Sequence, residues 1–280
     1  MIQFTVADWA AWAPGLHERE AWQAWSKAPV LPAGDDTPAL PEVPAMQRRR
    51  IERLGRMAVQ AAWWCSCAEA DGVPLVFASR HGDVQRSFEL LEQLARGEPM
   101  SPTHFGLSVH NAIAALYSIV RGERGNYLAL AAGRATAEAA LVEAAGLLAD
   151  GAPEVLVVVY DARPPAVYAD FLDEPDPFYA WSWRVRAAGE GARLSLAWAT
   201  DPAGEDASAH GIEVHRDAGA SLDDDRGRAD VHGIAASAAA PASAPAALPA
   251  GLDALRFLLA SDCSREHRVD GLRWTWRRHD

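Results

Sequence analysis

A hydroxyl and an imidazole stand close together in this sequence and could carry acyl chemistry. Ser108 and His110 are two residues apart in a stretch, residues 108–120, whose apolar spacing predicts a helix. A serine nucleophile needs a base within hydrogen-bonding reach, but helical residues two apart point to different faces. One candidate function is thus an independent acyltransferase or hydrolase that uses Ser108 and His110, although the helical geometry does not favour it. A structural role is the simpler interpretation of His110.

Three cysteines offer sulfur chemistry. Cys65, Cys67 and Cys263 make no disulfide framework, and a reducing compartment suits them. The pair Cys65-Ser66-Cys67 has no nearby histidine or further cysteine, so it supplies too few ligands for a metal ion. We expect ordinary buried thiols, no metal site and no cofactor.

A run of arginines forms a basic island in an acidic chain. Arg48, Arg49 and Arg50, followed by Arg53 and Arg56, contrast with a formal net charge of −12. The island could dock an acidic partner, or it could be a solvated helix face with acidic partners inside the chain. The net charge argues against a nucleic-acid or membrane-surface binder. Because no signal peptide or membrane-spanning run is evident, we expect a cytoplasmic protein.

The elements that must position these residues alternate between strand and helix. Apolar and β-branched runs predict strands at residues 4–12, 73–79, 127–132 and 155–160. Helical spacing predicts helices at residues 47–70, 84–96, 108–120 and 135–149. Residues 178–187 and 193–199, joined at Gly189-Glu190-Gly191, predict a hairpin at the edge of the sheet. This alternation indicates an α/β fold with a largely buried sheet.

Composition divides the chain into three parts. Residues 1–200 carry the alternating pattern and predict one α/β domain. Residues 201–250 are dominated by Ala, Asp, Gly, Ser and Pro, which predicts a flexible segment. Residues 251–280 return to a short amphipathic helix at 252–259 and a strand at 272–277, which we expect to pack back on the domain.

Short motifs follow one another in a fixed order between residues 99 and 162. They are Ser101-Pro102, Ser108-Val109-His110-Asn111, Arg124-Gly125 and Asp150-Gly151, the last followed by a Val-rich strand. In order and spacing this stretch resembles the N-terminal half of a β-ketoacyl synthase of the thiolase superfamily. The resemblance implies a thiolase-like half fold, a layered mixed sheet with flanking helices, with a β-ketoacyl synthase N-terminal-like domain at residues 1–200.

The two ends of the chain resemble a narrower group. The opening Trp9-Ala10-Ala11-Trp12-Ala13-Pro14-Gly15 and the closing Trp274-x-Trp276-Arg277-Arg278 are similar to stand-alone ketosynthase chain length factors, such as those of aryl polyene pathways. The resemblance implies pairing with a catalytic ketosynthase in fatty acid or polyketide biosynthesis. It also makes an acidic acyl carrier protein the candidate partner for Arg48, Arg49, Arg50 and Arg53.

The nucleophile position of the family falls on an arginine in this chain. In ketosynthases a cysteine begins the helix after the strand that follows the Arg-Gly pair, and the helix N-terminus stabilises its thiolate. Counted from Gly125 or from Gly151, that position is Arg134, within Ala131-Ala132-Gly133-Arg134-Ala135. A guanidinium has no nucleophilic lone pair, so Arg134 cannot take an acyl group. It is either a plug at the pocket floor or drift at a disused site.

The histidines that assist condensation are also missing from the pattern. In ketosynthases they come from the second half of a duplicated fold, and no second strand-turn-helix unit follows Pro175. His210, His215 and His232 lie in the low-complexity stretch and match no such motif. The resemblance implies a pocket around Phe105, His110, Asn111, Gly133 and Arg134. It also implies an interface along the strand that contains Leu128, Ala129, Leu130 and Ala131.

The predicted helix at residues 135–149 is apolar on almost every side. It consists mostly of alanine with Leu141, Val142, Leu147 and Leu148, and such a helix needs burial all round. Either the C-terminal segments fold back over it or a partner subunit covers it, and we expect the partner to be needed in part. We therefore predict a non-catalytic, chain-length-factor-like subunit that forms a heterodimer with a ketosynthase and shapes its acyl pocket. A self-associating scaffold is a further alternative.

Overall fold

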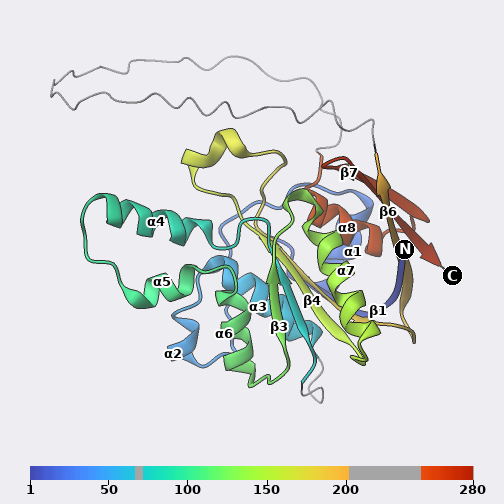
Figure 1. Ribbon diagram of the computed structural model, residues 1–280, viewed down its shortest axis with the longest axis horizontal. Helices are drawn as coiled ribbons and strands as arrows, with labels where there is room; N and C mark the ends of the chain where they lie inside the picture. The colour runs from blue at the N-terminus through green and yellow to red at the C-terminus, as the bar shows by residue number, and fades with distance from the viewer. Residues whose placement is uncertain (67–71, 202–246, 280) are drawn as a thin grey trace.

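One mixed sheet of eight strands organises the described part of the molecule. The computed structural model describes residues 1–66, 72–201 and 247–279, and its strands lie in the order β3-β2-β4-β5-β1-β6-β8-β7 (Figure 1). The strands are β1 (Ile2–Trp12), β2 (Leu75–Ala78), β3 (Tyr127–Leu130), β4 (Val155–Asp161), β5 (Tyr179–Arg186), β6 (Ala192–Thr200), β7 (Ser264–Val269) and β8 (Leu272–His279). The predicted α/β class with a mixed sheet and flanking helices is confirmed.

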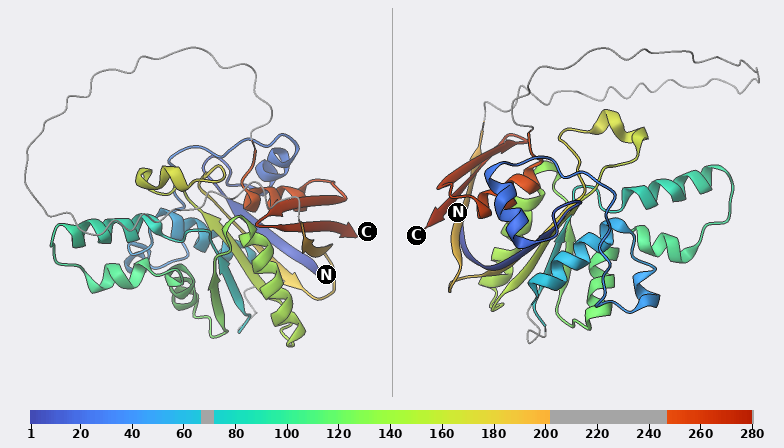
Figure 2. Two further views of the ribbon diagram at one scale, coloured as in Figure 1. Left: turned by 45° about the horizontal axis from the view of Figure 1, so that its top comes forward. Right: turned by 180° about the vertical axis from the view of Figure 1, so that it is seen from behind.

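Helices cover both faces of this sheet, as the two further views in Figure 2 also show. One face carries α1 (Arg19–Lys27), α7 (Thr136–Ala149) and α8 (Ala250–Leu259), and the other carries α3 (Arg53–Cys65) and α6 (Ala112–Arg121). The remaining helical segments are α2 (Ala45–Arg48), α4 (Val84–Ala95), α5 (Pro102–Ser108), η1 (Gly133–Ala135) and η2 (Ala166–Phe171).

The central strand β4 shows why the layers form. All seven of its residues are buried, as its β-branched run predicts. Because side chains alternate along a strand, Val155, Val157 and Val159 join the core on the α7 side. Leu156 and Val158 join the core on the α3 side. β4 pairs in parallel with β2, so their carboxyl ends meet at one edge of the sheet.

The predicted hairpin at Gly189-Glu190-Gly191 is wrong. β5 and β6 are not neighbours: both run antiparallel to β1, β5 on one side of it and β6 on the other. The connection therefore crosses β1 instead of reversing direction, and both strands are interior to the sheet. Gly191 makes the crossing possible, because a Cβ there would lie 2.2 Å from the Val6 carbonyl oxygen.

Two predicted helices are each interrupted. The stretch at residues 47–70 becomes α2 and then α3, and Arg56 donates hydrogen bonds to the carbonyls of Arg48 and Ile51 in the break. The stretch at residues 108–120 becomes the end of α5 and then α6. His110 and Asn111 lie in the turn between them and not on a helix.

The C-terminal segments complete the sheet and cover α7. β8 pairs with β6, and β7 pairs with β8 through a tight turn at Asp270-Gly271, where both residues have positive φ angles of 50° and 69°. α8 packs on α7, and the buried Glu138 of α7 accepts hydrogen bonds from Arg265, His267 and Trp276. The sequence prediction missed β7, although Asp-Gly is a strong hairpin signal.

Part of the sequence prediction lies outside the described residues. This applies to Cys67, to most of the predicted flexible segment at residues 201–250, and to its three histidines. Within the described ranges, no helix combines the length and the apolar character that a membrane span needs.

Candidate functional site

The turn after β3 presents Arg134 at the carboxyl edge of the sheet. Gly133 has a positive φ of 51°, which turns the chain from β3 into η1 and α7. The Thr136 hydroxyl accepts a hydrogen bond from the Ala132 amide (3.0 Å) and donates one to the Gly133 carbonyl (2.6 Å). Thr136 is thus committed to capping the turn and buried, which makes it a poor nucleophile.

Arg134 has an anionic companion on the segment after η2. Its Nε lies 3.7 Å from an Asp173 carboxylate oxygen, and its side chain is 36% exposed. A cation at a helix N-terminus opposes the helix dipole, and this carboxylate offsets the conflict. The turn therefore presents a guanidinium that shares the Asp173 carboxylate with Arg80.

The segment that carries Asp173 is clamped by a buried arginine. Arg80, at the carboxyl end of β2, pairs with Asp173, with Glu174 at 2.8 Å and with Asp176 at 3.0 Å. Only 5% of the Arg80 side chain is exposed, and Glu174 and Asp176 are buried, so these two contacts are shielded from water, whereas Asp173 is half exposed. Burial alone would lower the pKa of Arg80, but the surrounding carboxylates raise it, and the net result is a pKa above the usual value for arginine. The clamp fixes η2 and the following loop above the carboxyl edge of the sheet.

A second buried acid, Asp161, joins the ends of β2, β4 and β5. Its Oδ1 accepts hydrogen bonds from the Ser79 hydroxyl (3.0 Å) and the Arg80 amide (2.9 Å), and its Oδ2 accepts one from the Tyr179 hydroxyl (3.0 Å). Burial raises the pKa of Asp161 to about 7, although these donors and the Arg80 charge oppose the increase. Asp161 therefore binds three strand ends together.

The predicted pocket residues are only partly brought together. His110 Nε2 donates a hydrogen bond to the Ser79 carbonyl (3.0 Å), and a Cβ at Gly82 would lie 2.9 Å from its ring. Asn111 is exposed in the turn before α6, and Phe105 is 61% exposed on α5. His110 thus locks the chain near the end of β2, while Arg134 faces Asp173. Within the described residues, no hydrogen bond, ion pair or ring contact joins Phe105, His110 and Arg134.

The Ser108 hydroxyl has a partner other than His110. It donates to the Phe105 carbonyl at 2.9 Å, one helical turn earlier, and no Ser108–His110 hydrogen bond occurs in the described ranges. The arrangement expected of a serine acyltransferase or hydrolase is therefore not assembled here.

The two cysteines that the structure describes lie away from the β3–α7 turn. Cys65 is buried at the end of α3, and burial raises the pKa of its thiol to about 12. A thiol with such a pKa has almost no thiolate at neutral pH, so it is unreactive. Cys263 is exposed between α8 and β7. Among the described residues, no cluster of His, Cys, Asp and Glu could hold a metal ion.

The fold and this strand-to-helix turn agree with a known family. Residues 22–277 match the family model described as the N-terminal domain of β-ketoacyl synthases. The chain belongs to this β-ketoacyl synthase family. No curated protein sequence matches the chain.

Solved structures are similar to this β-ketoacyl synthase family member. A chain of the complex between the ketosynthase ApeO and its chain length factor ApeC from Xenorhabdus doucetiae is 25% identical, with a TM-score of 0.73 and coverage of 99% of this chain and 100% of that one. The ishigamide ketosynthase/chain length factor is 18% identical, with a TM-score of 0.58 and coverage of 72% and 68%. A β-ketoacyl synthase from Burkholderia phymatum is 16% identical, with a TM-score of 0.53 and coverage of 72% and 65%. The last two show the fold alone.

Besides Arg56, which bonds the break between α2 and α3, the arginine island of this β-ketoacyl synthase family member divides into two groups. Arg48 donates to the carbonyls of Ala39 and Leu40, and Arg53 donates to those of Gly34 and Asp36. Arg53 also stacks over the Phe178 ring at 4.1 Å. These two arginines hold the loop before α2 in place.

Arg49 and Arg50 form the second group. Both are exposed, and no ion pair of either occurs among the described residues. They are the members of the island that remain free to meet an acidic surface.

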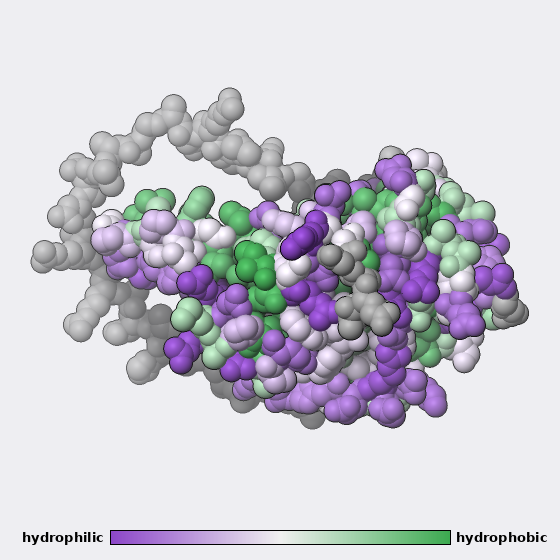
Figure 3. Space-filling view, turned by 90° about the horizontal axis from the view of Figure 1, so that it is seen from below, coloured by the Kyte–Doolittle hydropathy of each residue, from purple (hydrophilic) through white to green (hydrophobic). Residues whose placement is uncertain are grey.

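The predicted interface strand β3 lies at one end of the sheet. It pairs with β2 on one side and has no strand neighbour on the other in the part of the chain that the structure describes. Leu128 on β3 is 36% exposed and Ile119 on the neighbouring α6 is 67% exposed. The space-filling view from below shows hydrophobic residues among hydrophilic ones on that face (Figure 3). An unpaired strand edge beside exposed apolar side chains is the kind of surface on which a second strand can pair.

Sequence reasoning missed the buried ionic groups of this family member. Arg80 and Asp161 each follow a short apolar strand, and a charged residue directly after a buried run is a usable signal. Glu138 and Glu143 are the charged residues of an alanine-rich helix, which is a second signal, since a carboxylate on a largely apolar helix needs partners where it is buried. Their partners at residues 173–176 and 265–276 could not be assigned, because nothing local pairs residues about a hundred positions apart.

Proposed function

We propose that this protein is a non-catalytic, chain-length-factor-like subunit that pairs with a catalytic β-ketoacyl synthase. The observation that carries the proposal is Arg134 at the strand-to-helix turn, paired with Asp173 where the family's resemblance places a nucleophilic cysteine. The similarity to a chain of a ketosynthase–chain length factor complex over the full length of both chains supports it. The subunit would act by shape and contact on its partner's acyl pocket.

The partner surface that we propose includes the free edge of β3, with Leu128, Ala129, Leu130 and Ala131. An edge strand that is not blunted by charge or proline is suited to pairing with a second strand. The pocket-facing residues would be Phe105, His110, Asn111, Gly133 and Arg134. Among these, Phe105 is the exposed apolar side chain and the one best able to enter a neighbouring chain.

Co-expression with a catalytic ketosynthase of the same organism tests the proposal. We expect the two chains to elute together on gel filtration, and we expect product length to change or product to disappear when this chain is omitted. Separate elution together with unchanged products would refute the pairing. Elution as a homodimer that ignores the ketosynthase would favour the scaffold alternative.

We also propose that Arg49 and Arg50 contribute to docking of an acidic acyl carrier protein, since both charges are exposed and uncommitted. The double variant Arg49→Glu, Arg50→Glu should weaken carrier-protein binding to the complex, with a steeper loss at low salt. The variant Arg124→Glu, Arg277→Glu, at two other exposed sites, is the matched control. Equal carrier-protein binding by the two double variants would contradict this docking site.

A further inference from the structure

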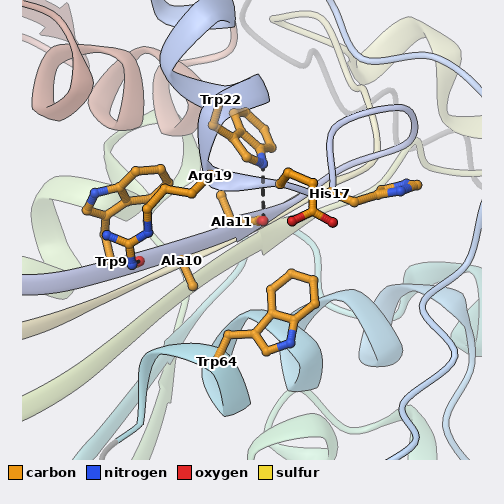
Figure 4. Close-up of a pocket in the computed structure, with 8 residues that line it drawn as sticks. Trp9, Ala10, Ala11, His17, Arg19, Trp22 and Trp64 are labelled. Atoms are coloured by element: carbon orange, nitrogen blue, oxygen red, sulfur yellow. Dashed lines mark hydrogen bonds between the residues drawn. The ribbon is translucent and has the colours of Figure 1, made fainter.

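A small cavity opens beside the carboxyl-terminal half of β1, between α1 and α3. Its volume is about 190 Å³, and Figure 4 shows its labelled residues around β1. It is lined by Trp9, Ala10, Ala11, His17, Glu18, Arg19, Trp22 and Trp64. None of these residues belongs to the site described above.

The crossing of β1 by the β5–β6 connection creates this cavity. β6 pairs with residues Ile2–Val6 of β1, while β5 follows β1 to Trp12, so the second half of β1 has one strand neighbour in the described residues. Side chains occupy the open edge instead. The Arg19 guanidinium donates to the Trp9 carbonyl, and the Trp22 indole donates to the Ala11 carbonyl at 3.1 Å. The edge is therefore closed to another strand, but the cavity beside it can admit a side chain.

One charge in the lining lacks a counter-charge. Arg19 pairs with Asp8 at 2.7 Å, and His17 pairs with Asp36 at 3.1 Å. The exposed Glu18 carboxylate makes no hydrogen bond or ion pair in the part of the chain that the structure describes, although Glu18 precedes α1. The Glu18 carboxylate could therefore pair with a cation that enters the cavity.

An exposed indole stands across β1 from Trp22 in the same cavity. Trp64 is 44% exposed and has no ring contact or hydrogen bond among the described residues. Figure 4 shows Trp22 and Trp64 on opposite sides of the β1 ribbon. Aromatic faces attract cations, and this chain already stacks Arg19 on Trp9 at 4.4 Å and Arg121 on Trp63 at 4.8 Å. The free face of Trp64 offers the same interaction to another molecule.

We propose that this cavity binds an arginine side chain of the ketosynthase partner, with the guanidinium between the Trp64 indole and the Glu18 carboxylate. The inference rests on the proposed function. The volume is below the roughly 300–1,000 Å³ of pockets for whole small molecules, so it suits a single side chain. A planar guanidinium stacks on an indole better than an ammonium does. The net charge of −12 further favours a cationic contact from the partner.

Titration of the isolated protein tests the cavity without the partner. With indole ¹⁵N labelling, N-acetyl-arginine amide should shift the Trp64 Nε1–H signal saturably, whereas the uncharged N-acetyl-citrulline amide should not. The variant Trp64→Phe lacks this indole, so the signal that disappears from its spectrum is that of Trp64. Glu18→Gln should weaken the arginine response about fivefold, the size of an exposed charge interaction. An unmoved Trp64 signal, or an equal response to citrulline, would overturn the arginine site.

Affinity for the ketosynthase tests the partner assignment. Trp64→Ala should weaken the complex about tenfold, as loss of an interface tryptophan does. The matched control is Trp198→Ala on β6, because Trp198 is 42% exposed but packs on Trp274 outside the cavity. Equal affinity of the two variants would overturn the partner assignment. If the wild-type chain does not bind the ketosynthase at all, the proposed function fails, and the titration still decides whether the cavity takes arginine.

Discussion

Two ionisable side chains, Arg134 and Asp161, lie at the carboxyl edge of the sheet, where the candidate site is. Arg134 presents a guanidinium, paired with Asp173, at the turn into α7. Asp161 is buried and ties the ends of three strands through its two oxygens. Neither side chain is placed to act as a nucleophile. Arg134 contacts the segment after η2, and Asp161 joins the ends of β2, β4 and β5.

Asp161 makes the free energy of unfolding of this protein decrease as pH rises. Because burial raises its pKa to about 7 from 3.8, the folded chain holds this proton more tightly than the unfolded chain does between those values. Its contribution to the free energy of unfolding is present at low pH and is lost as pH rises towards about 7. Asp161→Asn keeps the shape without titrating.

Urea denaturation of both proteins across this range measures the effect. The variant should gain stability relative to wild type as pH rises from about 4 to about 8, by on the order of a few kcal/mol. The exposed Asp150→Asn is the control and should show no such gain. A stability difference between Asp161→Asn and wild type that is independent of pH would contradict a raised pKa.

At the scale of elements, α7 is held by the C-terminal hairpin through one carboxylate. Glu138 is fully buried and accepts from His267 at 2.9 Å, from Trp276 at 3.2 Å and from Arg265 at 3.3 Å. These partners lower the pKa of Glu138 although burial alone would raise it. The cover that the apolar helix requires thus comes in large part from its own chain.

Glu138→Ala should destabilise the fold by about 3 kcal/mol, because it leaves a buried arginine with one carboxylate fewer. Amide hydrogen exchange in β7 and β8 should accelerate in this variant, since the tie to α7 is gone. Glu143→Ala, at an exposed position of the same helix, is the control and should change stability by less than about 0.5 kcal/mol. Similar effects of the two substitutions would rule out the tie.

Local pattern was enough to predict most elements but not how they assemble. The Val-rich run of β4, the alanine-rich α7 and the strand at the start of the chain follow from apolar spacing within each segment. The order of β5, β1 and β6 does not, because Gly189 and Gly191 are typical of a hairpin and also permit a crossing. The same limit applies to the candidate site. Motif spacing is enough to predict that Arg134 lies at the turn after β3, and its role there stays a prediction. The partners of Arg80 lie about a hundred residues away and could not be assigned from local pattern.

At the scale of the molecule, the sheet continues past the family's strand-turn-helix unit through β6, β8 and β7. β6 comes before residues 202–246, which the structure does not describe, and β7 and β8 come after them. Both parts of the chain therefore build one sheet. The free edge of β3 lies at the opposite end from β7. A partner that pairs with β3 would extend the sheet without disturbing the C-terminal cover of α7.

Intact-mass spectrometry of the complex with its ketosynthase, after exposure to an acylated carrier protein, tests the central claim most directly. We predict that the acyl group adds to the ketosynthase chain alone and that the mass of this chain stays unchanged. A stoichiometric acyl adduct on any side chain of this protein would contradict the claim that it acts without covalent chemistry of its own.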